Sequence, residues 1–212
     1  MAECFESKVV YTLREAAALM QLPLPDMVQY AEQGILSAFQ ISGGHWRMDH
    51  ASLASFMAAR NIDKPAGWDA PPRKFRVLVV EDDPDLLEIT SELLKDEPRI
   101  EVRAENNGFT AGLQIAGWRP DLVLLDFLMP GISGFELCAR LREREETSDL
   151  PVLALTSLTG IDKMKEIYAS GVSDFLGKPF HSQNLLSKVR CLLGLEQAPA
   201  KTREILPGAP ES

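Results

Sequence analysis

Short apolar runs alternate with longer amphipathic segments along residues 75–195. Two or three of the runs are apolar on both faces, which is typical of parallel strands covered by helices. Strict alternation of strand and helix favours a doubly wound α/β fold with a five-stranded parallel sheet. The predicted strands are FRVLVV (75–80), IEVRA (100–104), DLVLLD (121–126), PVLALT (151–156) and DFLG (174–177). The predicted helices span 84–96, about 107–116, 133–146, 161–170 and 181–193.

The beginning of the chain has a different pattern, with helix signals around a hairpin. Thr12 and Glu15 form a T-x-x-E capping box ahead of REAAALM, which predicts a helix start. After the turn LPLP, the segment DMVQYAEQ predicts a second helix that ends at Gly34. The glycines of SAFQI-SGG-HWRM suit a tight turn at Gly43, and Asp49 is expected to cap a third helix, HASLASFMAAR. This order of elements is that of a winged helix-turn-helix.

Proline-rich segments without a periodic apolar pattern mark the expected domain boundaries. Residues 61–74, NIDKPAGWDAPPRK, hold three prolines and one glycine, which is typical of a linker. Residues 196–212, EQAPAKTREILPGAPES, have the same character and are expected to form a disordered tail. The chain is therefore predicted to consist of a small domain at 1–60, a linker at 61–74, a larger domain at 75–195 and a tail at 196–212.

Composition narrows the classes of protein that remain. The chain has 212 residues, of which 45% are hydrophobic, and no apolar run is long enough to span a membrane. The start MAECFESKVV does not look like a secretory signal, so we expect a cytoplasmic protein. The three cysteines are widely spaced and form no CxxC pair, so they are interpreted as reduced thiols. A net charge of −9 argues against general affinity for nucleic acid or anionic membranes.

Polar and charged residues stand where the predicted strands end. Glu81 and Asp82 follow the first strand, Asp126 ends the third, Thr156 ends the fourth, and Lys178 follows the fifth. Because the carboxyl ends of parallel strands meet at one edge, these side chains are expected to converge there. Clustered carboxylates repel one another, and Mg²⁺ relieves that repulsion. Together with the Lys178 ammonium, the cation can neutralise a phosphoryl group that arrives on a carboxylate.

Acidic residues after strands also serve as helix N-caps, and we expect Asp85 and Asp162 to do so. The set at the ends of successive strands is harder to explain by capping alone. The sequence contains no G-x-G-x-x-G or G-x-x-x-x-G-K-[ST] loop, so nucleotide-binding versions of the fold lose support.

Four short motifs lie at the ends of predicted strands. They are VVEDD at 79–83, LLDFLMPGISGFEL at 124–137, LTS at 155–157 and DFLGKPF at 174–180. With these motifs, residues 75–195 resemble the receiver domain of two-component response regulators. The resemblance implies that Asp126 is the phosphoacceptor and that it receives the phosphoryl group from a histidine kinase or a phosphotransfer protein. It also implies that Asp82 binds Mg²⁺ directly, that Glu81 acts through water, and that the backbone carbonyl of Leu128 completes the coordination. Lys178 would bind the phosphate.

The same resemblance implies a conformational switch. Thr156 and Phe175 fall on the switch positions, where the hydroxyl turns to the phosphate and the ring turns inward. The bond between Lys178 and Pro179 is expected to be cis, as in the family. Phosphorylation would alter the face formed by residues 161–193, which is expected to form a homodimer.

Leu128 departs from the pattern of many receivers, which carry at this position a polar side chain that orients the attacking water. A leucine there is expected to shield the acyl phosphate, so we predict slow loss of the phosphoryl group.

Nearly all of residues 8–60 resembles the small MerR-like or excisionase-type DNA-binding domain. In that family the second helix enters the major groove and the wing contacts the DNA backbone or minor groove. By this resemblance Gln29, Tyr30 and Gln33 can reach bases, and His45 and Arg47 stand on the wing together with a tryptophan, Trp46. Trp46 is interpreted as a core anchor. For Arg47, a phosphate contact and a solvated strand residue both remain open.

The charge of the first domain fits DNA poorly. Residues 1–60 hold four basic and six acidic residues, a net charge of −2, whereas a DNA reader normally shows a basic face. Two functions therefore stay open: a transcriptional regulator whose DNA-binding domain precedes the receiver, and a signalling adaptor in which the same domain binds a protein partner. A stand-alone enzyme is not expected, because no catalytic group lies outside the receiver pocket.

Overall fold

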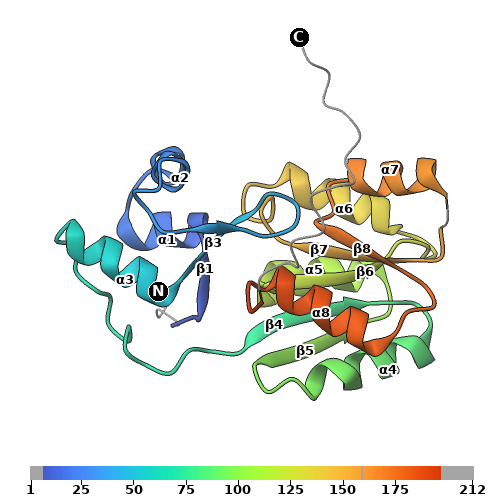
Figure 1. Cartoon of the computed structure of the whole chain (residues 1–212). Coiled ribbons are helices and arrows are strands. Elements are labelled where there is room, and N and C mark those ends of the chain that lie inside the picture. The colour runs from blue at the N-terminus through green and yellow to red at the C-terminus, as the bar shows by residue number, and fades with distance from the viewer. Residues whose placement is uncertain (1–6, 159, 197–212) are drawn as a thin grey trace, which may run out of the picture.

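The computed structural model describes residues 7–158 and 160–196, and Figure 1 shows the path of the chain. A small antiparallel sheet with its helices forms the N-terminal part, and a larger parallel sheet with helices on both faces forms the rest. The predicted tail at 196–212 lies, except for Glu196, outside the described residues.

Five parallel strands form the larger sheet in the order β5-β4-β6-β7-β8. Every residue of β6 and β7 is buried, which explains why these runs are apolar on both faces. The chain leaves β4 for the edge strand β5 and then returns to β6, so the switch point lies between β4 and β6. The predicted five-stranded parallel sheet is confirmed. Its strands are β4 (Phe75–Val80), β5 (Ile100–Glu105), β6 (Leu122–Asp126), β7 (Val152–Thr156) and β8 (Asp174–Gly177).

The helices of this part cover the two faces of the sheet (Figure 1). One buried cluster joins the sheet to α5, α6 and α7, and a second joins it to α4 and α8. The helices are α4 (Pro84–Lys95), α5 (Gly108–Trp118), α6 (Gly134–Glu143), α7 (Ile161–Ala169) and α8 (Ser182–Leu192). Helix α6 ends three residues earlier than predicted, because Arg142 donates hydrogen bonds to the carbonyl oxygens of Thr147 and Leu150 and fixes the following turns.

The predicted N-caps of α4 and α7, Asp85 and Asp162, are each wrong by two residues. Asp83 caps α4, accepting hydrogen bonds from the backbone of Asp85 and Leu86 at 3.0 and 3.3 Å. Gly160, with a φ of 99°, occupies the cap position of α7. Asp85 and Asp162 lie in the first turns, where a carboxylate interacts favourably with the positive end of the helix dipole.

The N-terminal part contains the predicted helices and hairpin, together with one strand that was not predicted. The capping box of Thr12 and Glu15 is present, and the Asp49 side chain accepts from the backbone N–H of Ser52. The unpredicted strand β1 pairs with β3, giving a sheet of order β1-β3-β2. The elements are β1 (Val10–Thr12), α1 (Leu13–Met20), α2 (Leu24–Glu32), β2 (Phe39–Gln40), β3 (Trp46–Asp49) and α3 (His50–Ala59).

The proline-rich segment 61–74 packs against the N-terminal part. Trp68 is only 3% exposed; its ring is parallel to that of Tyr11 with 6.2 Å between centroids and meets the His50 ring at a tilt with 4.1 Å between centroids. The backbone N–H of Arg73 also donates to the carbonyl oxygen of Ser7. Composition indicated a linker, and the structure shows that its middle is anchored by one buried aromatic side chain.

The two parts of the chain share a core and ion pairs. Val10 of β1 belongs to the same buried cluster as Phe75 and Leu193. Asp121, just before β6, accepts from Lys8 Nζ at 2.9 Å and from both terminal nitrogens of Arg73 at 2.7 and 2.9 Å. These contacts hold the N-terminal part near the amino-terminal end of β6.

Two further expectations concern thiols and membranes. Cys138 is buried and Cys191 half-buried, and both are free thiols, in line with the interpretation from spacing. Within residues 7–158 and 160–196, no helix has the length and apolar character needed to cross a membrane.

Candidate functional site

The carboxyl ends of the strands bring three carboxylates together. Oxygen atoms of Glu81, Asp82 and Asp126 all lie within 4.8 Å of one another. Glu81 and Asp82 follow β4, and Asp126 is the last residue of the neighbouring strand β6. The register of parallel strands therefore produces the cluster that the sequence predicted at this edge.

Lys178, which directly follows the edge strand β8, links two of these carboxylates. Its Nζ donates to Glu81 at 2.9 and 2.6 Å and to Asp126 Oδ2 at 2.8 Å. The side chains of Glu81 and Asp126 are 1% and 7% exposed, whereas Asp82 is exposed. One ammonium thus faces a cluster with more negative charge than it can balance.

The electrostatics of the cluster follow from this imbalance. Burial raises the pKa of the Glu81 carboxyl to about 7, although its hydrogen bonds to Lys178 act in the opposite direction. Burial by itself lowers the pKa of Lys178, but its bonds to Asp126 and Glu81 outweigh that effect and hold the pKa above its ordinary value. Keeping every carboxylate charged is therefore costly, and a bound divalent cation reduces that cost.

The loop after β6 holds Asp126 in place. The backbone N–H of Leu128 donates to Asp126 Oδ1 at 2.9 Å, which leaves Oδ2 toward Lys178. Gly134 begins α6 against this loop, and a Cβ there would lie 2.7 Å from the Asp126 carbonyl oxygen and the Phe127 Cα. A glycine is required because α6 approaches the backbone so closely. Sequence reasoning missed this role, although Gly134 lies inside a motif that carries the resemblance.

The two expected switch residues lie on β7 and β8. Thr156 is 1% exposed, and its hydroxyl oxygen accepts from the backbone N–H of Leu158 at 3.0 Å. The Phe175 ring is half-buried and meets Tyr168 edge-on, with 5.4 Å between ring centroids. The peptide bond between Lys178 and Pro179 is cis, as the resemblance implied.

On α2, the three residues expected to reach bases differ in exposure. Gln29 and Gln33 are exposed, but Tyr30 is half-buried against Phe56. The Arg60 guanidinium covers both rings, at 4.5 Å from the Tyr30 centroid and 3.8 Å from the Phe56 centroid. Tyr30 therefore packs against the N-terminal core in this structure, and of the three residues only Gln29 and Gln33 are exposed.

The residues of the predicted wing differ in how deeply they are buried. Arg47 is 5% exposed and donates to the carbonyl oxygen of Trp46, so the interpretation as a solvated strand residue is wrong. Trp46 packs against the N-terminal core, as expected. His45 is half-buried, and burial, followed by the positive charges of Arg47 and Arg142, lowers its pKa to about 4.

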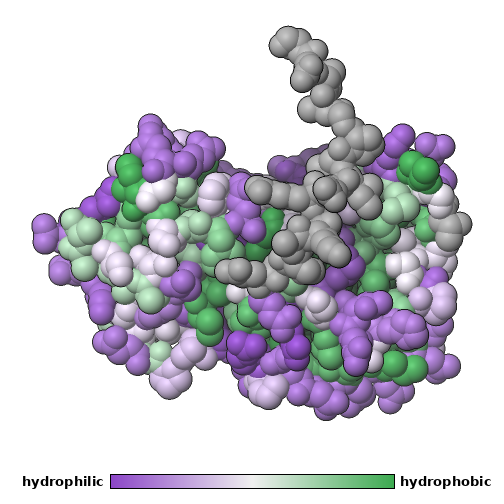
Figure 2. Space-filling view, in the orientation of Figure 1, coloured by the Kyte–Doolittle hydropathy of each residue, from purple (hydrophilic) through white to green (hydrophobic). Residues whose placement is uncertain are grey.

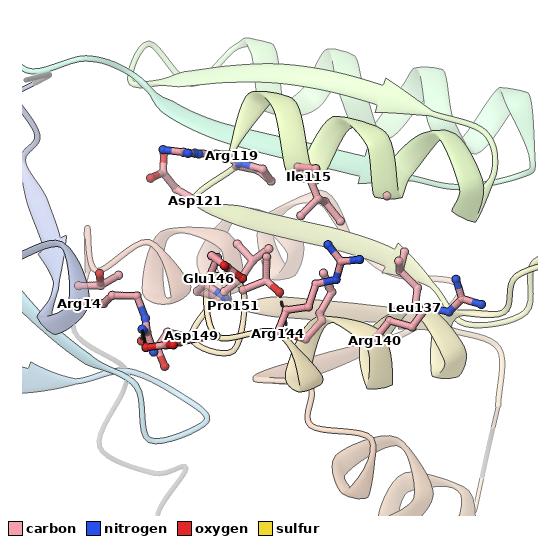
Figure 3. Close-up of a pocket in the computed structure, with 18 of the residues that line it drawn as sticks. Arg14, Ile115, Arg119, Asp121, Leu137, Arg140, Arg144, Glu146, Asp149 and Pro151 are labelled. Atoms are coloured by element: carbon pink, nitrogen blue, oxygen red, sulfur yellow. Dashed lines mark hydrogen bonds and ion pairs between the residues drawn. The ribbon is translucent and has the colours of Figure 1, made fainter. Parts of the chain in front are cut away.

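A large cavity lies away from the acidic cluster. It has a volume of about 990 Å³ and is lined by α5, α6, residues 144–151 and the N-terminal part (Figure 3). In Figure 3, Arg14 reaches from the N-terminal part toward Asp149, while Arg140 and Arg144 stand along α6 and at its end. The carboxylates of the predicted site do not line this cavity, so it is a gap beside the contact between the two parts of the chain.

A parallel sheet of this order with an acidic cluster and a lysine at its carboxyl edge defines a class of phosphoacceptor domains. The chain belongs to the response regulator receiver family. The model of that family, described as "Response regulator receiver domain", matches residues 77–190.

Curated relatives are named as transcriptional regulators. The DNA-binding dual master transcriptional regulator RpaA of Synechocystis is 37% identical over 139 residues, covering 64% of this chain and 57% of that protein. The phosphate regulon transcriptional regulatory protein PhoB of Rhizobium meliloti is 36% identical over 118 residues, covering 56% of this chain and 52% of that protein. The chain thus spans about half the length of these relatives.

Solved receivers have the same fold. Chemotaxis response regulator CheY4 of Vibrio cholerae has a TM-score of 0.53 and 29% identity, covering 56% of this chain and 98% of that one. The signal receiver domain of a DNA-binding response regulator protein from Colwellia psychrerythraea has a TM-score of 0.54 and 29% identity, covering 57% and 99%.

Proposed function

We propose that this protein is a two-component response regulator that is phosphorylated on Asp126 and controls an N-terminal DNA-binding domain at 1–60. One observation carries the first half of the proposal: Lys178 bridges Glu81 and Asp126 at hydrogen-bond distance, with Asp82 beside them. This arrangement supplies a carboxylate nucleophile, a fixed positive charge and oxygen ligands for a cation.

The residues fit Mg²⁺ by their chemistry and spacing. Three carboxylates approach within 4.8 Å, and hard divalent cations prefer such oxygen ligands. Exposed Asp82 and the acceptor Asp126 would bind the ion directly, Glu81 would act through water, and the Leu128 carbonyl would complete the protein ligands. When bound, Mg²⁺ supplies positive charge to the phosphoryl oxygens. Glu81 and Lys178 already hold one another, so the pocket is largely formed before phosphorylation.

The proposed chemistry is transfer from a phosphohistidine of a histidine kinase or phosphotransfer protein. A carboxylate oxygen of Asp126 attacks phosphorus, the new O–P bond forms as the N–P bond breaks, and the departing imidazole keeps the electron pair. Lys178 would move its hydrogen bond from the carboxylate to a phosphoryl oxygen. The Thr156 hydroxyl would turn to the phosphate and Phe175 inward, which would change the face at 161–193 and favour a homodimer.

For the output, DNA binding is supported by the relatives that are named DNA-binding regulators. Within this chain, Gln29 and Gln33 are the exposed polar side chains that α2 can present to base edges. Salt-dependent electrophoretic shifts with genomic fragments test this half of the proposal. Binding that weakens steeply as salt rises would support it, and absence of binding at low salt would contradict it.

A second function, a signalling adaptor, is favoured by the charge of the outer face of α2. That face carries Asp26 and Glu32 without any lysine or arginine, and phosphate groups would repel it. Figure 2 shows a mostly hydrophilic surface over this helix. A protein partner with basic side chains fits such a face better than DNA does.

Replacing Asp82 with asparagine is expected to weaken Mg²⁺ binding by at least about tenfold, because one direct charged ligand is lost. Isothermal titration of the unphosphorylated protein with Mg²⁺ measures the effect. Asp85→Asn is the matched control, because Asp85 lies outside the cluster in the first turn of α4. Equal affinities of the two variants would remove Asp82 from the proposed ligand set.

Replacing Leu128 with asparagine is expected to shorten the lifetime of the acyl phosphate. The Leu128 side chain is 51% exposed beside Asp126, so a polar group there can orient water toward the phosphorus. We expect hydrolysis on the order of tenfold faster, which corresponds to about 1.4 kcal/mol of activation free energy. Loss of label after removal of the phosphodonor measures the rate, and an unchanged half-life would refute the shielding role.

A further inference from the structure

The large cavity beside the contact between the two parts of the chain is lined by a buried arginine that lacks an acidic partner. Arg47 is 5% exposed and lines this cavity. Among the described residues it makes one hydrogen bond, from a terminal nitrogen to the carbonyl oxygen of Trp46 at 2.9 Å, and no ion pair. A guanidinium has several N–H donors, so most of those on Arg47 have no acceptor from the described protein. A buried cation in this state is unfavourable, and an anion in the cavity would offset that penalty.

The pairing of the strands sets the direction of Arg47. On β3 it lies opposite Thr12 of β1 and Phe39 of β2, and directly paired residues share one face of a sheet. Thr12 also lines the cavity, and the Phe39 ring lies 3.2 Å from a Cβ built on Gly194, beyond α8. The register of the small sheet therefore places the guanidinium at the wall of the cavity.

The carboxylates nearest to Arg47 are already bonded to other cations. Burial lowers the pKa of Arg47, while the charges of Glu15, Asp149 and Asp121 act against that effect without forming an ion pair with it. The cations that bond these carboxylates are Lys8 for Glu15, Arg14 for Asp149, and Lys8 with Arg73 for Asp121. These carboxylates are therefore shared with other cations, and Arg47 keeps unused donors at the cavity.

The same cavity has apolar walls on the receiver, between α5 and α6 (Figure 3). Ile115 of α5 and Leu137 of α6 line it and are each 4% exposed, and Leu113 of α5 lines it while 61% exposed. Its volume of about 990 Å³ lies within the range of small-molecule sites. The cavity thus offers a cation on the side of the N-terminal part and apolar surface on the side of the receiver.

The charge balance favours a carboxylate over a phosphate as the anion. A carboxylate has a single negative charge and can accept two parallel hydrogen bonds from the planar guanidinium. A phosphate monoester carries about 1.5 to 2 negative charges at neutral pH, so it would bring surplus negative charge toward Glu15, Asp121 and Asp149.

We propose that this cavity binds a small-molecule carboxylate whose remaining part is apolar, with the carboxylate on Arg47 and the apolar part between Ile115 and Leu137. Such a ligand would satisfy the buried guanidinium and cover the apolar walls of α5 and α6. Because the acidic cluster does not line the cavity, the inference does not depend on phosphorylation or on DNA binding.

Calorimetric titration of the full-length protein with octanoate tests the proposal, with octyl phosphate and octanol as comparison ligands. Arg47→Met removes the charge and keeps an unbranched stem. Arg60→Met is its matched control, because Arg60 belongs to the same part of the chain, covers aromatic rings and does not line the cavity. A second pair, Leu113→Ser and Ile89→Ser, changes two exposed apolar residues of which only Leu113 lines the cavity. This second pair decides the matter if circular dichroism shows that Arg47→Met does not fold.

We expect octanoate to bind at a single site, and to bind at least about tenfold more weakly to Arg47→Met and about threefold more weakly to Leu113→Ser, with both controls unchanged. Absence of octanoate binding by the unmodified protein at millimolar concentration would overturn the inference. Equal affinities of folded Arg47→Met and Arg60→Met, or of Leu113→Ser and Ile89→Ser, would overturn it as well. Tighter binding of octyl phosphate would overturn the choice of a carboxylate, and equal binding of octanol would overturn the role of the Arg47 charge.

Discussion

Replacement of Asp126 with asparagine is expected to reduce phosphoryl uptake to background. The amide oxygen is a poor nucleophile and carries no charge, so it can neither attack phosphorus nor share a cation with Asp82. The change should preserve the fold, because asparagine has nearly the same shape and its amide oxygen can still accept the hydrogen bond from the backbone N–H of Leu128, although the bond from Lys178 to the second oxygen is lost. Incubation with a small phosphodonor and Mg²⁺, followed by intact-protein mass spectrometry, measures the uptake.

Asp96→Asn provides the matched control for this experiment. Asp96 is an exposed residue at the C-terminal end of α4 and lies outside the acidic cluster. The control is expected to incorporate the phosphoryl group at the rate of the unmodified protein. If Asp126→Asn also incorporates at that rate, another residue is the acceptor.

Replacement of Asp121 with asparagine is expected to lower the free energy of unfolding by about 3 kcal/mol, because it breaks a largely buried charge network. The Asp121 side chain is 14% exposed and binds Lys8, both terminal nitrogens of Arg73 and the backbone N–H of Arg76. An amide removes the negative charge that Lys8 and Arg73 share, in a place from which water is mostly excluded. Urea denaturation at neutral pH measures the loss.

Asp149→Asn is the control, since Asp149 is 40% exposed and its ion pair with Arg14 is expected to contribute less than about 1 kcal/mol. The pH dependence gives a second check on Asp121. Burial by itself raises its pKa, but Lys8 and Arg73 outweigh burial and hold the pKa below its ordinary value. The stabilisation is therefore present above the unfolded-state pKa of about 3.9 and is lost as pH falls through the lower folded value. A difference between Asp121→Asn and the unmodified protein that stays constant down to pH 2 would contradict this assignment.

The parallel sheet and the acidic site were predictable from the sequence because both depend on local order. Apolar runs fix the strands, and the residue that follows each run must lie at the carboxyl edge. That reasoning placed Glu81, Asp82, Asp126 and Lys178 together, and the structure brings them within hydrogen-bond distance or a few ångströms. The close approach at Gly134 was missed, because no local pattern distinguishes a glycine needed for packing from one that permits a turn.

The contact between the two parts of the chain was not predictable, because it depends on residues far apart in sequence. Arg14 and Asp149 are 135 positions apart, and Lys8 and Asp121 are 113 apart. No local sequence pattern assigns a partner to any of these four charged residues. Trp68 likewise lies in a proline-rich segment whose composition predicts a linker, yet its ring is buried against Tyr11 and His50.

The central claim is that Asp126 becomes an acyl phosphate in the pocket formed with Glu81, Asp82 and Lys178. Reduction of the phosphorylated protein with labelled borohydride, followed by peptide sequencing, tests it most directly, because borohydride converts an aspartyl phosphate to labelled homoserine. The account predicts labelled homoserine at position 126 after treatment with phosphodonor and Mg²⁺. Label at any other position, or a phosphorylated protein that borohydride leaves unlabelled, would contradict it.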